Sequence, residues 1–383
     1  MFDTALFEER LKNFTPEPLV PVEATPPSET QTVQEDATTI DLTKVNYLNF
    51  LNNDEIKKAC EDVIREYGVG TCGPPVFYGT TDLHLKLEQS LSEFLQMGSN
   101  TALTYSYGLV AISSSIAAFC KEEDFIFADE RANAAIEQGL ITSRSTVVRF
   151  GHNDPNDLRK KAAKNGNKSK KYLIVEGISW TTGKVCRLPE FLEVAEEFHM
   201  RIFLDESHSL GVLGANGRGV IEHYNLDPNR VDMVIATFEG AVGSVGGFAT
   251  GPDYTTIERL RLSSKGFLFS ASLPSFLVKA VLKGIELIGD KPKRFAKLAQ
   301  SVHEFLQECG FDVVSDPEAP FKLIRCESVD LEGQVHHYCR NKGVYFIHNE
   351  SGLVLNLNIK LLEEPERLQR VFDVLKEASN VFL

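Results

Sequence analysis

The sequence predicts an α/β protein, with a large domain built on a mainly parallel sheet and a smaller α+β domain at the C-terminus. From residue 100 to residue 268, short apolar runs alternate with helical stretches, which is the pattern of repeated βα units. The apolar runs are continuous rather than alternating, as expected for strands covered on both faces. The chain of 383 residues is long enough for both domains. We expect an N-terminal extension at residues 1–39, the large domain at 40–285 and the small domain at 286–383.

Composition excludes several classes of protein. The formal net charge of -14 argues against a nucleic-acid-binding groove, because phosphate binding needs clustered Lys and Arg. The seven cysteines are dispersed and form no CxxC pair, so we expect reduced thiols rather than disulfides or a zinc site. The histidines form no HExxH motif, and no bound metal is expected.

Residues 1–39 are acidic and rich in proline, so they cannot bury enough apolar surface to fold alone. Within them, residues 6–14 have the apolar spacing of a helix that can lie on a partner or a membrane, although a frayed tail is favoured. No apolar run reaches the roughly 20 residues needed to span a bilayer. We therefore expect no transmembrane segment in the chain itself.

The elements follow in order. Residues 45–51 are predicted as a short strand, residues 54–67 as a helix that ends at Gly68, and residues 67–88, rich in glycine and proline, as a loop. Strands of the large domain are predicted at residues 101–106, 124–129, 145–150, 171–177, 201–207 and 232–238. An Ala- and Ser-rich helix follows the first of these strands, and further helices are predicted at residues 132–143, 157–164 and 188–199. Ligands of such sheets bind at the carboxyl ends of the strands.

A helix at residues 276–288 is predicted to lead into the C-terminal domain. There we expect strands at residues 311–314, 320–326, 343–347 and 352–359, and helices at 294–309 and 364–382. This mixture is typical of a small α+β domain.

The run at residues 232–238 breaks into a glycine-rich turn, T-F-E-G-A-V-G from Thr237 to Gly243. It resembles the cofactor-lysine segment of the α-oxoamine synthases, pyridoxal-phosphate (PLP) enzymes that join an amino acid to an acyl-CoA with loss of carbon dioxide. Their pattern is close to T-x-x-K-A-x-G, and the lysine forms a Schiff base with the cofactor. Here Gly240 stands at the lysine position, and no lysine occurs between Lys184 and Lys265. An ordinary turn with chance similarity is the alternative.

Residues 205–208 (D-E-S-H) resemble the family motif D-[DE]-[AS]-H. The resemblance implies that Asp205 would hold the pyridinium nitrogen of the cofactor and that His208 would contact its phenolic oxygen. Because the lysine is missing, we favour the alternative that both residues are vestigial and serve as a helix cap and an interface hydrogen bond.

Further departures indicate a degenerate site. The histidine that stacks on the cofactor in active members aligns with Asn133, whose amide is a poorer stacking face. A small serine aligns with Trp180, which would fill cofactor space or pack at an interface. The arginine that binds the substrate carboxylate is absent between Arg340 and Arg367. We therefore expect no catalytic residue in this chain and only vestigial cofactor contacts from Asp205, His208 and Asn133.

Residues 67–88 strongly resemble the family signature GTxGxRxxxGTxxxHxxLE, which lies at the dimer interface beside the active sites. With Phe77 and Tyr78 in this segment, the sequence is most similar to the non-catalytic long-chain-base subunits of serine palmitoyltransferases. The usual Arg-Gly pair is replaced by Pro75 and Val76, which puts any anion contact there in doubt.

Residues 267–274 match a family segment that reaches toward the cofactor phosphate of the opposite subunit. Ser270 and Ser272 are therefore candidates to act in trans, together with Phe77 and Tyr78. Helix capping is the alternative role for the two hydroxyls.

The resemblance implies a fold-type I PLP-dependent transferase fold and a non-catalytic subunit. A lysine-bearing catalytic partner would hold PLP and condense L-serine with palmitoyl-CoA to 3-ketosphinganine, with the acyl-CoA near the interface. Small membrane regulatory subunits are further partners that it implies. The expected location is the cytosolic face of the endoplasmic reticulum membrane, within a complex. Family members usually carry an N-terminal membrane helix, and this chain begins where that helix would end, as a shortened form or a variant without it.

Two alternatives stay open at this stage. One is an autonomous PLP-dependent acyltransferase that uses a displaced lysine such as Lys265. The other is a structural homodimeric scaffold without a partner enzyme.

Overall fold

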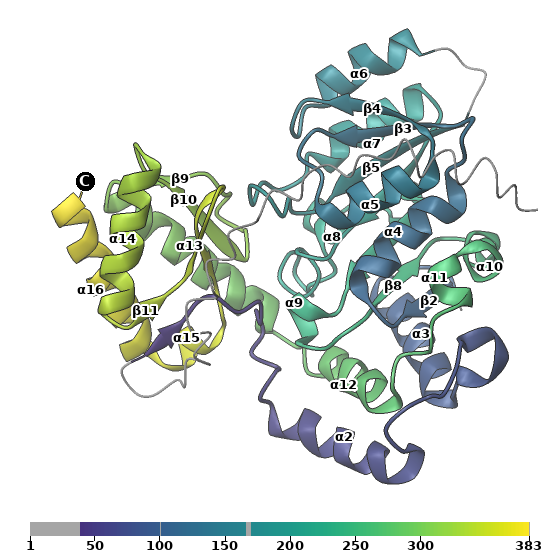
Figure 1. Cartoon of the computed structure of the whole chain (residues 1–383), viewed down its shortest axis with the longest axis horizontal. Coiled ribbons are helices and arrows are strands. Elements are labelled where there is room, and N and C mark those ends of the chain that lie inside the picture. The colour runs from purple at the N-terminus through teal and green to yellow at the C-terminus, as the bar shows by residue number, and fades with distance from the viewer. Residues whose placement is uncertain (1–38, 100, 166–169, 383) are drawn as a thin grey trace, which may run out of the picture. The chain divides into compact units, whose positions relative to one another are not determined.

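The central element is a seven-stranded sheet of strand order β2-β8-β7-β6-β5-β3-β4, seen in a computed structural model that describes residues 39–99, 101–165 and 170–382 (Figure 1). Its strands are β2 (Ala102–Tyr105), β3 (Phe125–Asp129), β4 (Thr146–Phe150), β5 (Lys171–Glu176), β6 (Met200–Asp205), β7 (Met233–Thr237) and β8 (Gly247–Thr250). Only β8 is antiparallel to its neighbours β2 and β7, whereas the other pairs are parallel. The predicted mainly parallel sheet is confirmed.

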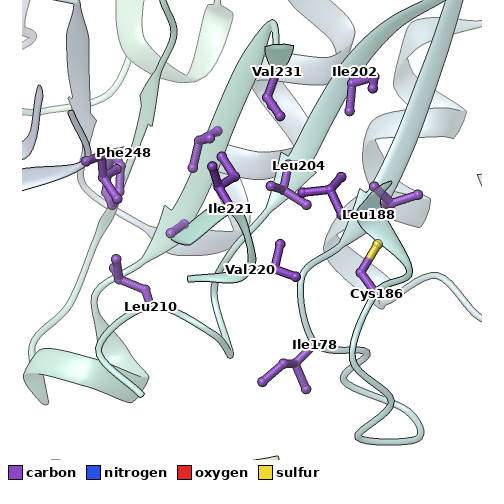
Figure 2. Close-up of a cluster of buried hydrophobic side chains, with 14 of the residues drawn as sticks. Ile178, Cys186, Leu188, Ile202, Leu204, Leu210, Val220, Ile221, Val231 and Phe248 are labelled. Atoms are coloured by element: carbon purple, nitrogen blue, oxygen red, sulfur yellow. The ribbon is translucent and has the colours of Figure 1, made fainter. Parts of the chain in front are cut away.

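Both faces of this sheet are buried. On β5, Leu173 and Val175 enter one apolar core, while Tyr172 and Ile174 enter a second core on the other face. Figure 2 shows part of the first core. Alternate side chains of one strand point to opposite faces, so two covered faces explain the continuous apolar runs.

Helices supply the rest of these cores. They are, in chain order, α2 (Asp54–Tyr67), α3 (Asp82–Phe94), α4 (Gly108–Phe119), α5 (Ala134–Ser143), α6 (Pro155–Lys164), α7 (Leu188–Glu197), α8 (Val220–His223), α9 (Glu239–Val242), α10 (Tyr254–Ser263), α11 (Lys265–Leu268) and α12 (Ser275–Glu286). Side chains set several starts: Asn133 caps α5 and Asp154 caps α6, each by accepting two backbone N–H bonds. These caps explain why α5 begins two residues later than the helix predicted at 132–143. They also explain why α6 begins two residues earlier than the helix predicted at 157–164. In the part of the chain described, no helix has both the length and the apolarity to cross a bilayer.

The C-terminal part holds a four-stranded antiparallel sheet of order β12-β13-β10-β9. Its elements are α13 (Lys291–Glu308), β9 (Asp312–Val313), β10 (Phe321–Arg325), α14 (Val329–Asn341), β11 (Val344–Tyr345), β12 (Ile347–Asn349), β13 (Gly352–Asn356), α15 (Lys360–Glu363) and α16 (Pro365–Phe382). The predicted α+β character is confirmed. A short strand near the start of the described chain, β1 (Ile40–Asp41), pairs in parallel with β11. The described residues from Ile40 onward form one compact unit, and the division at residue 285 stays a prediction.

Residues 45–51 form turns, and the predicted strand there is wrong. The Asn46 side chain accepts hydrogen bonds from the N–H groups of Phe50 and Leu51, and Asn49 has a left-handed φ of 58°. This bends the backbone away from a strand conformation. The segment is apolar because Tyr47, Phe50 and their neighbour Leu48 are buried, which sequence periodicity did not distinguish from a strand.

Two other predictions need correction, and one helix was missed. The segment at residues 67–88 is not all loop, because a π-helical turn covers Pro75–Gly79 and α3 begins at Asp82, where Thr81 and His84 form a capping box. Helix α14 was not predicted. The strand expected at 343–347 is split, because β11 pairs with β1 whereas β12 pairs with β13. The helical spacing noted at residues 6–14 lies outside the described residues.

We expect Asn46→Ala to lower the free energy of unfolding by about 1–3 kcal/mol, because two N–H groups lose their shared acceptor. Urea denaturation followed by circular dichroism measures the change. The exposed Asn52→Ala is the matched control and should shift stability by less than about 0.5 kcal/mol. Equally small effects of both substitutions would mean that Asn46 does not hold the turn.

Candidate functional site

Acidic side chains gather at the carboxyl ends of two neighbouring strands. Glu176 ends β5 and Asp205 ends β6, and the two residues are paired directly across the sheet. Glu206 follows in the same turn and is completely buried. Such a concentration of buried acids at the carboxyl edge marks this position as the candidate site.

The carboxylate of Asp205 is bonded by the chain's own donors. One oxygen accepts hydrogen bonds from the backbone N–H and the hydroxyl of Ser207, and the other accepts one from Nδ2 of Asn133 at 2.9 Å. Burial raises the pKa of Asp205, and the bonds from Ser207 and Asn133 oppose that shift. The acid is buried but well supplied with donors.

Asn133 ties helix α5 to both acids. Its Oδ1 accepts from the N–H groups of Ala135 and Ile136 at 2.9 and 3.0 Å, and its own N–H donates to Glu176 Oε2 at 3.1 Å. Because Nδ2 also donates to Asp205, every polar atom of the Asn133 side chain is used. The residue predicted as a poor stacking face acts here as a helix cap and a hydrogen-bond donor.

The two glutamates have strongly raised pKa values. Burial, together with the neighbouring Asp205 charge, raises the pKa of Glu176 to about 8, although the N–H groups of Trp180 and Asn133 donate to it. Burial raises the pKa of Glu206 to about 7, although it accepts from Ser209 and from the Val220 N–H. Glu176 therefore favours the protonated form at neutral pH, whereas Glu206 titrates near neutral pH.

His208 is enclosed by aromatic side chains. Its Nδ1 lies 2.9 Å from the Tyr47 hydroxyl, and the Trp180 ring stacks on it with centroids 4.4 Å apart and an interplanar angle of 27°. Phe321 of β10 packs edge-on against both rings. Burial lowers the pKa of His208 to about 4, so the imidazole is neutral at physiological pH. Trp180 remains 44% exposed and covers His208.

Gly240 lies in α9, directly after β7. A β-carbon at this position would lie 2.8 Å from the ring of Tyr47, so any side chain requires that ring to move. The Gly240 carbonyl also accepts a hydrogen bond from the Tyr47 N–H. The adjacent Glu239 directs a carboxylate oxygen toward Gly108, the first residue of α4.

A second group of predicted residues lies on the segments that hold Gly73 and Ser272. The Ser272 N–H donates to the Gly73 carbonyl, and the Thr71 hydroxyl donates to the Ser272 carbonyl, which fixes the two family segments together. Among the residues described, the buried Ser272 Oγ has no hydrogen-bond partner. Ser270 lines an open pocket of about 470 Å³ beside Ser272. On the neighbouring π-helical turn, Phe77 and Tyr78 are 69% and 70% exposed.

The structure thus brings Asp205, His208, Asn133 and Trp180 together and leaves Lys265 elsewhere. Lys265 is exposed and lines a separate pocket with Lys121, between α4, α5 and the end of α10. The sequence analysis missed Tyr47, Glu176, Ser207 and Glu239. Glu176 carried a usable signal, since like Asp205 it ends a buried strand, whereas the segment holding Tyr47 was mistaken for a strand.

Residues 37–368 match the family model for aminotransferase class I and II. The chain belongs to this family. Its relatives include long chain base biosynthesis protein 1c of Oryza sativa subsp. japonica, 36% identical over 341 residues that cover 84% of this chain and 70% of that protein. Serine palmitoyltransferase 1 of Dictyostelium discoideum is 39% identical over 274 residues, or 70% of this chain and 57% of that protein. The chain therefore spans little more than half of one relative and 70% of the other.

Solved structures agree with this family. A structure of SPT with a PLP internal aldimine superposes with a TM-score of 0.84 at 26% identity, covering 90% of this chain and 88% of that one. The fold-type I architecture predicted from the sequence is confirmed, and the family is one that uses PLP.

We expect Glu176 to lower the free energy of unfolding as pH rises from 5 to 8, a contribution opposite in sign to that of His208, whose lowered pKa favours folding as pH rises toward 6.5. Glu176, with its pKa raised from 4.5 to about 8, keeps its proton in the folded chain but loses it in the unfolded chain across this range, so rising pH favours unfolding. Glu206 acts in the same direction. Glu176→Gln should remove at least about 1 kcal/mol of this pH dependence.

Urea unfolding at several pH values measures this effect. The more exposed Glu190→Gln is the control and should leave the pH profile unchanged. An unaltered slope in Glu176→Gln would contradict the assignment.

Proposed function

We propose that this chain is the non-catalytic subunit of a serine palmitoyltransferase complex. A lysine-bearing homologue would hold PLP and condense L-serine with palmitoyl-CoA to 3-ketosphinganine, while this chain stabilises it and completes its acyl-CoA and cofactor pocket. The observation that carries the proposal is Gly240: it offers no amine at the family's lysine position, and the ring of Tyr47 lies against it. The names of the relatives, long chain base biosynthesis protein 1c and serine palmitoyltransferase 1, support the same role.

The residues present do not fit a resident PLP. A Schiff base needs an amine, which Gly240 lacks, and the Asp205 oxygen that would face a pyridinium nitrogen already accepts from Asn133. We therefore assign no step of the reaction to Asp205 or His208, and in our proposal the cofactor belongs to the partner.

Exposed aromatic side chains support a subunit interface. Phe77, Tyr78, Tyr107 and Phe269 are 69%, 70%, 63% and 73% exposed. Tyr107 and Ser270 line the same open pocket of about 470 Å³, and α11, which ends just before Phe269, packs on the turn that holds Phe77 and Tyr78. Aromatic residues are enriched at protein interfaces, and large exposed apolar patches mark interaction sites. In our proposal this face meets the catalytic subunit, and Ser270 and Ser272 contribute to its site in trans.

The proposal includes a location and further partners. The complex would lie on the cytosolic face of the endoplasmic reticulum membrane with small membrane regulatory subunits, and acyl-CoA would bind near the interface. The autonomous acyltransferase is less well supported, because Lys265 lines a pocket that does not include Asp205 or His208.

Co-expression with a lysine-bearing homologue tests the proposed function. We expect 3-ketosphinganine only when both chains are present, and none from this chain alone with PLP, L-serine and palmitoyl-CoA. Activity of the isolated chain would overturn the assignment. A stable homodimer that forms no complex with the homologue would instead support the role of a structural scaffold.

The interface is tested by the double substitution Phe77→Ala and Tyr78→Ala. Loss of two exposed aromatic anchors is expected to weaken the complex by about 30-fold or more, equivalent to about 2 kcal/mol. Sedimentation velocity with the partner measures this. Val329→Ala on α14, a second exposed apolar side chain, is the control and should leave the affinity unchanged. Equal affinities for all forms would place the interface elsewhere.

A further inference from the structure

We infer that the cofactor pocket of this chain is filled by its own side chains, with Asn133, Glu239 and the Tyr47–Trp180 pair occupying the places of the ring nitrogen, phosphate and ring contacts of PLP. The pocket therefore excludes PLP even without a covalent bond, and restoring the lysine alone does not reopen it. This goes beyond the missing Schiff base and concerns only this chain, so it does not depend on a partner subunit.

The first place that a side chain fills is the site of the cofactor's ring nitrogen. A bound pyridinium N–H would need an oxygen of Asp205, and Asn133 Nδ2 already donates to one oxygen while Ser207 donates twice to the other. Asn133 cannot swing away freely, because its Oδ1 caps α5 through two N–H bonds and its N–H is held by Glu176. A ligand that displaced Nδ2 would leave a buried amide without its acceptor, which is costly.

The second place that a side chain fills is the site of the cofactor's phosphate. The N-terminus of a helix at the carboxyl edge of a parallel sheet is the usual place for a ligand phosphate. At the start of α4, Glu239 Oε1 lies 3.1 Å from the position of a β-carbon on Gly108, and Thr237 touches the same glycine. The carboxyl group is largely buried, which raises its pKa, while a hydrogen bond from Thr237 opposes the shift. A phosphate dianion placed here would meet an acid instead of free donors.

The third filled place is the site of the cofactor ring, where Tyr47 and Trp180 enclose His208. Its Nδ1 faces the Tyr47 hydroxyl at 2.9 Å, and one face of its ring is covered by Trp180 at 4.4 Å between centroids. Tyr47 is completely buried, and its ring packs against both His208 and Phe295 of α13, which hold it in place. The same ring lies 2.8 Å from the position of a β-carbon on Gly240. A lysine introduced there displaces Tyr47 before it meets any cofactor.

Trp180 is the only tryptophan in the chain, so its fluorescence reports directly on this pocket. The probe is pyridoxamine phosphate, which has the ring and phosphate of PLP but no aldehyde and so does not label surface lysines. Titrated into the full-length chain, it is expected to give no saturable change in Trp180 fluorescence, with equilibrium dialysis as a second readout. Gly240→Lys is expected to behave identically and to form no visible aldimine absorbance with PLP.

The pocket is opened by the double substitution Asn133→Ser and Glu239→Ser. Serine still caps α5 but does not carry the amide donor, and loss of Glu239 frees the start of α4. Tyr47 and Trp180 stay at the ring contacts in this variant, but with the ring-nitrogen and phosphate ends freed it is expected to bind pyridoxamine phosphate saturably, at least about tenfold more tightly than the weakest binding that the titration of the unmodified chain can detect. The control is Asn53→Ser with Glu190→Ser, which changes the same residue types at another helix cap and another site, and is expected to bind no better than the unmodified chain.

Two results would overturn the inference: saturable micromolar binding by the unmodified chain, or no gain in the folded double variant. If thermal melting shows that the double variant is unfolded, each single variant is titrated instead. The absence of any gain in binding by both folded single variants would then overturn the inference. Neither result bears on the proposed complex, whose failure would appear as missing activity with the homologue.

Discussion

The burial of both faces of the seven-stranded sheet is the constraint on which the rest of the structure depends. With apolar cores above and below, polar groups of the strands are confined to their ends, and at the carboxyl edge they become crowded and poorly hydrated. Glu176 and Asp205, paired across β5 and β6, are the direct product of this confinement. Their raised pKa values follow from the position that the fold gives them.

Buried acids crowded at one edge of a sheet need hydrogen-bond partners. In this chain the partners are internal. Asn133 and Ser207 satisfy Asp205, Trp180 and Asn133 donate to Glu176, and Tyr47 meets His208. A buried polar network is stabilising only when its members are satisfied, and these internal partners supply that satisfaction. The proposed role as a non-catalytic subunit and the filled pocket are thus two aspects of one change.

Much of the fold was predictable because it rests on local patterns. Six strands of the large sheet, the βα alternation and the α+β character of the C-terminal part follow from continuous apolar runs and helix signals. The prediction for residues 45–51 was wrong because the sequence of a buried turn can be as apolar as that of a buried strand. The contact that decides between them is the hydrogen bond accepted by the Asn46 side chain, which the apolar pattern does not encode. The antiparallel β8 and helix α14 were missed, since β8 is a strand of four residues that includes a glycine, and α14 holds three adjacent aromatic or imidazole residues, which are poorer helix formers.

The candidate site divides in the same way. Asp205, His208, Asn133 and Trp180 were found because they sit in short motifs after strands. Tyr47 and Glu239 act through contacts between distant segments, such as Tyr47 with Gly240 and His208, and no spacing rule encodes such contacts.

The pairing of β1 with β11 has a consequence for biosynthesis of the chain. Ile40 leaves the ribosome long before its strand partner Val344, which lies 304 residues further along the chain. The β1 anchor of the segment that carries Tyr47 can therefore form only after β11 has been made, and closing so long a loop is slow. A chain truncated before β11 would keep most strands of the large sheet yet lack the anchor that holds this segment against Gly240.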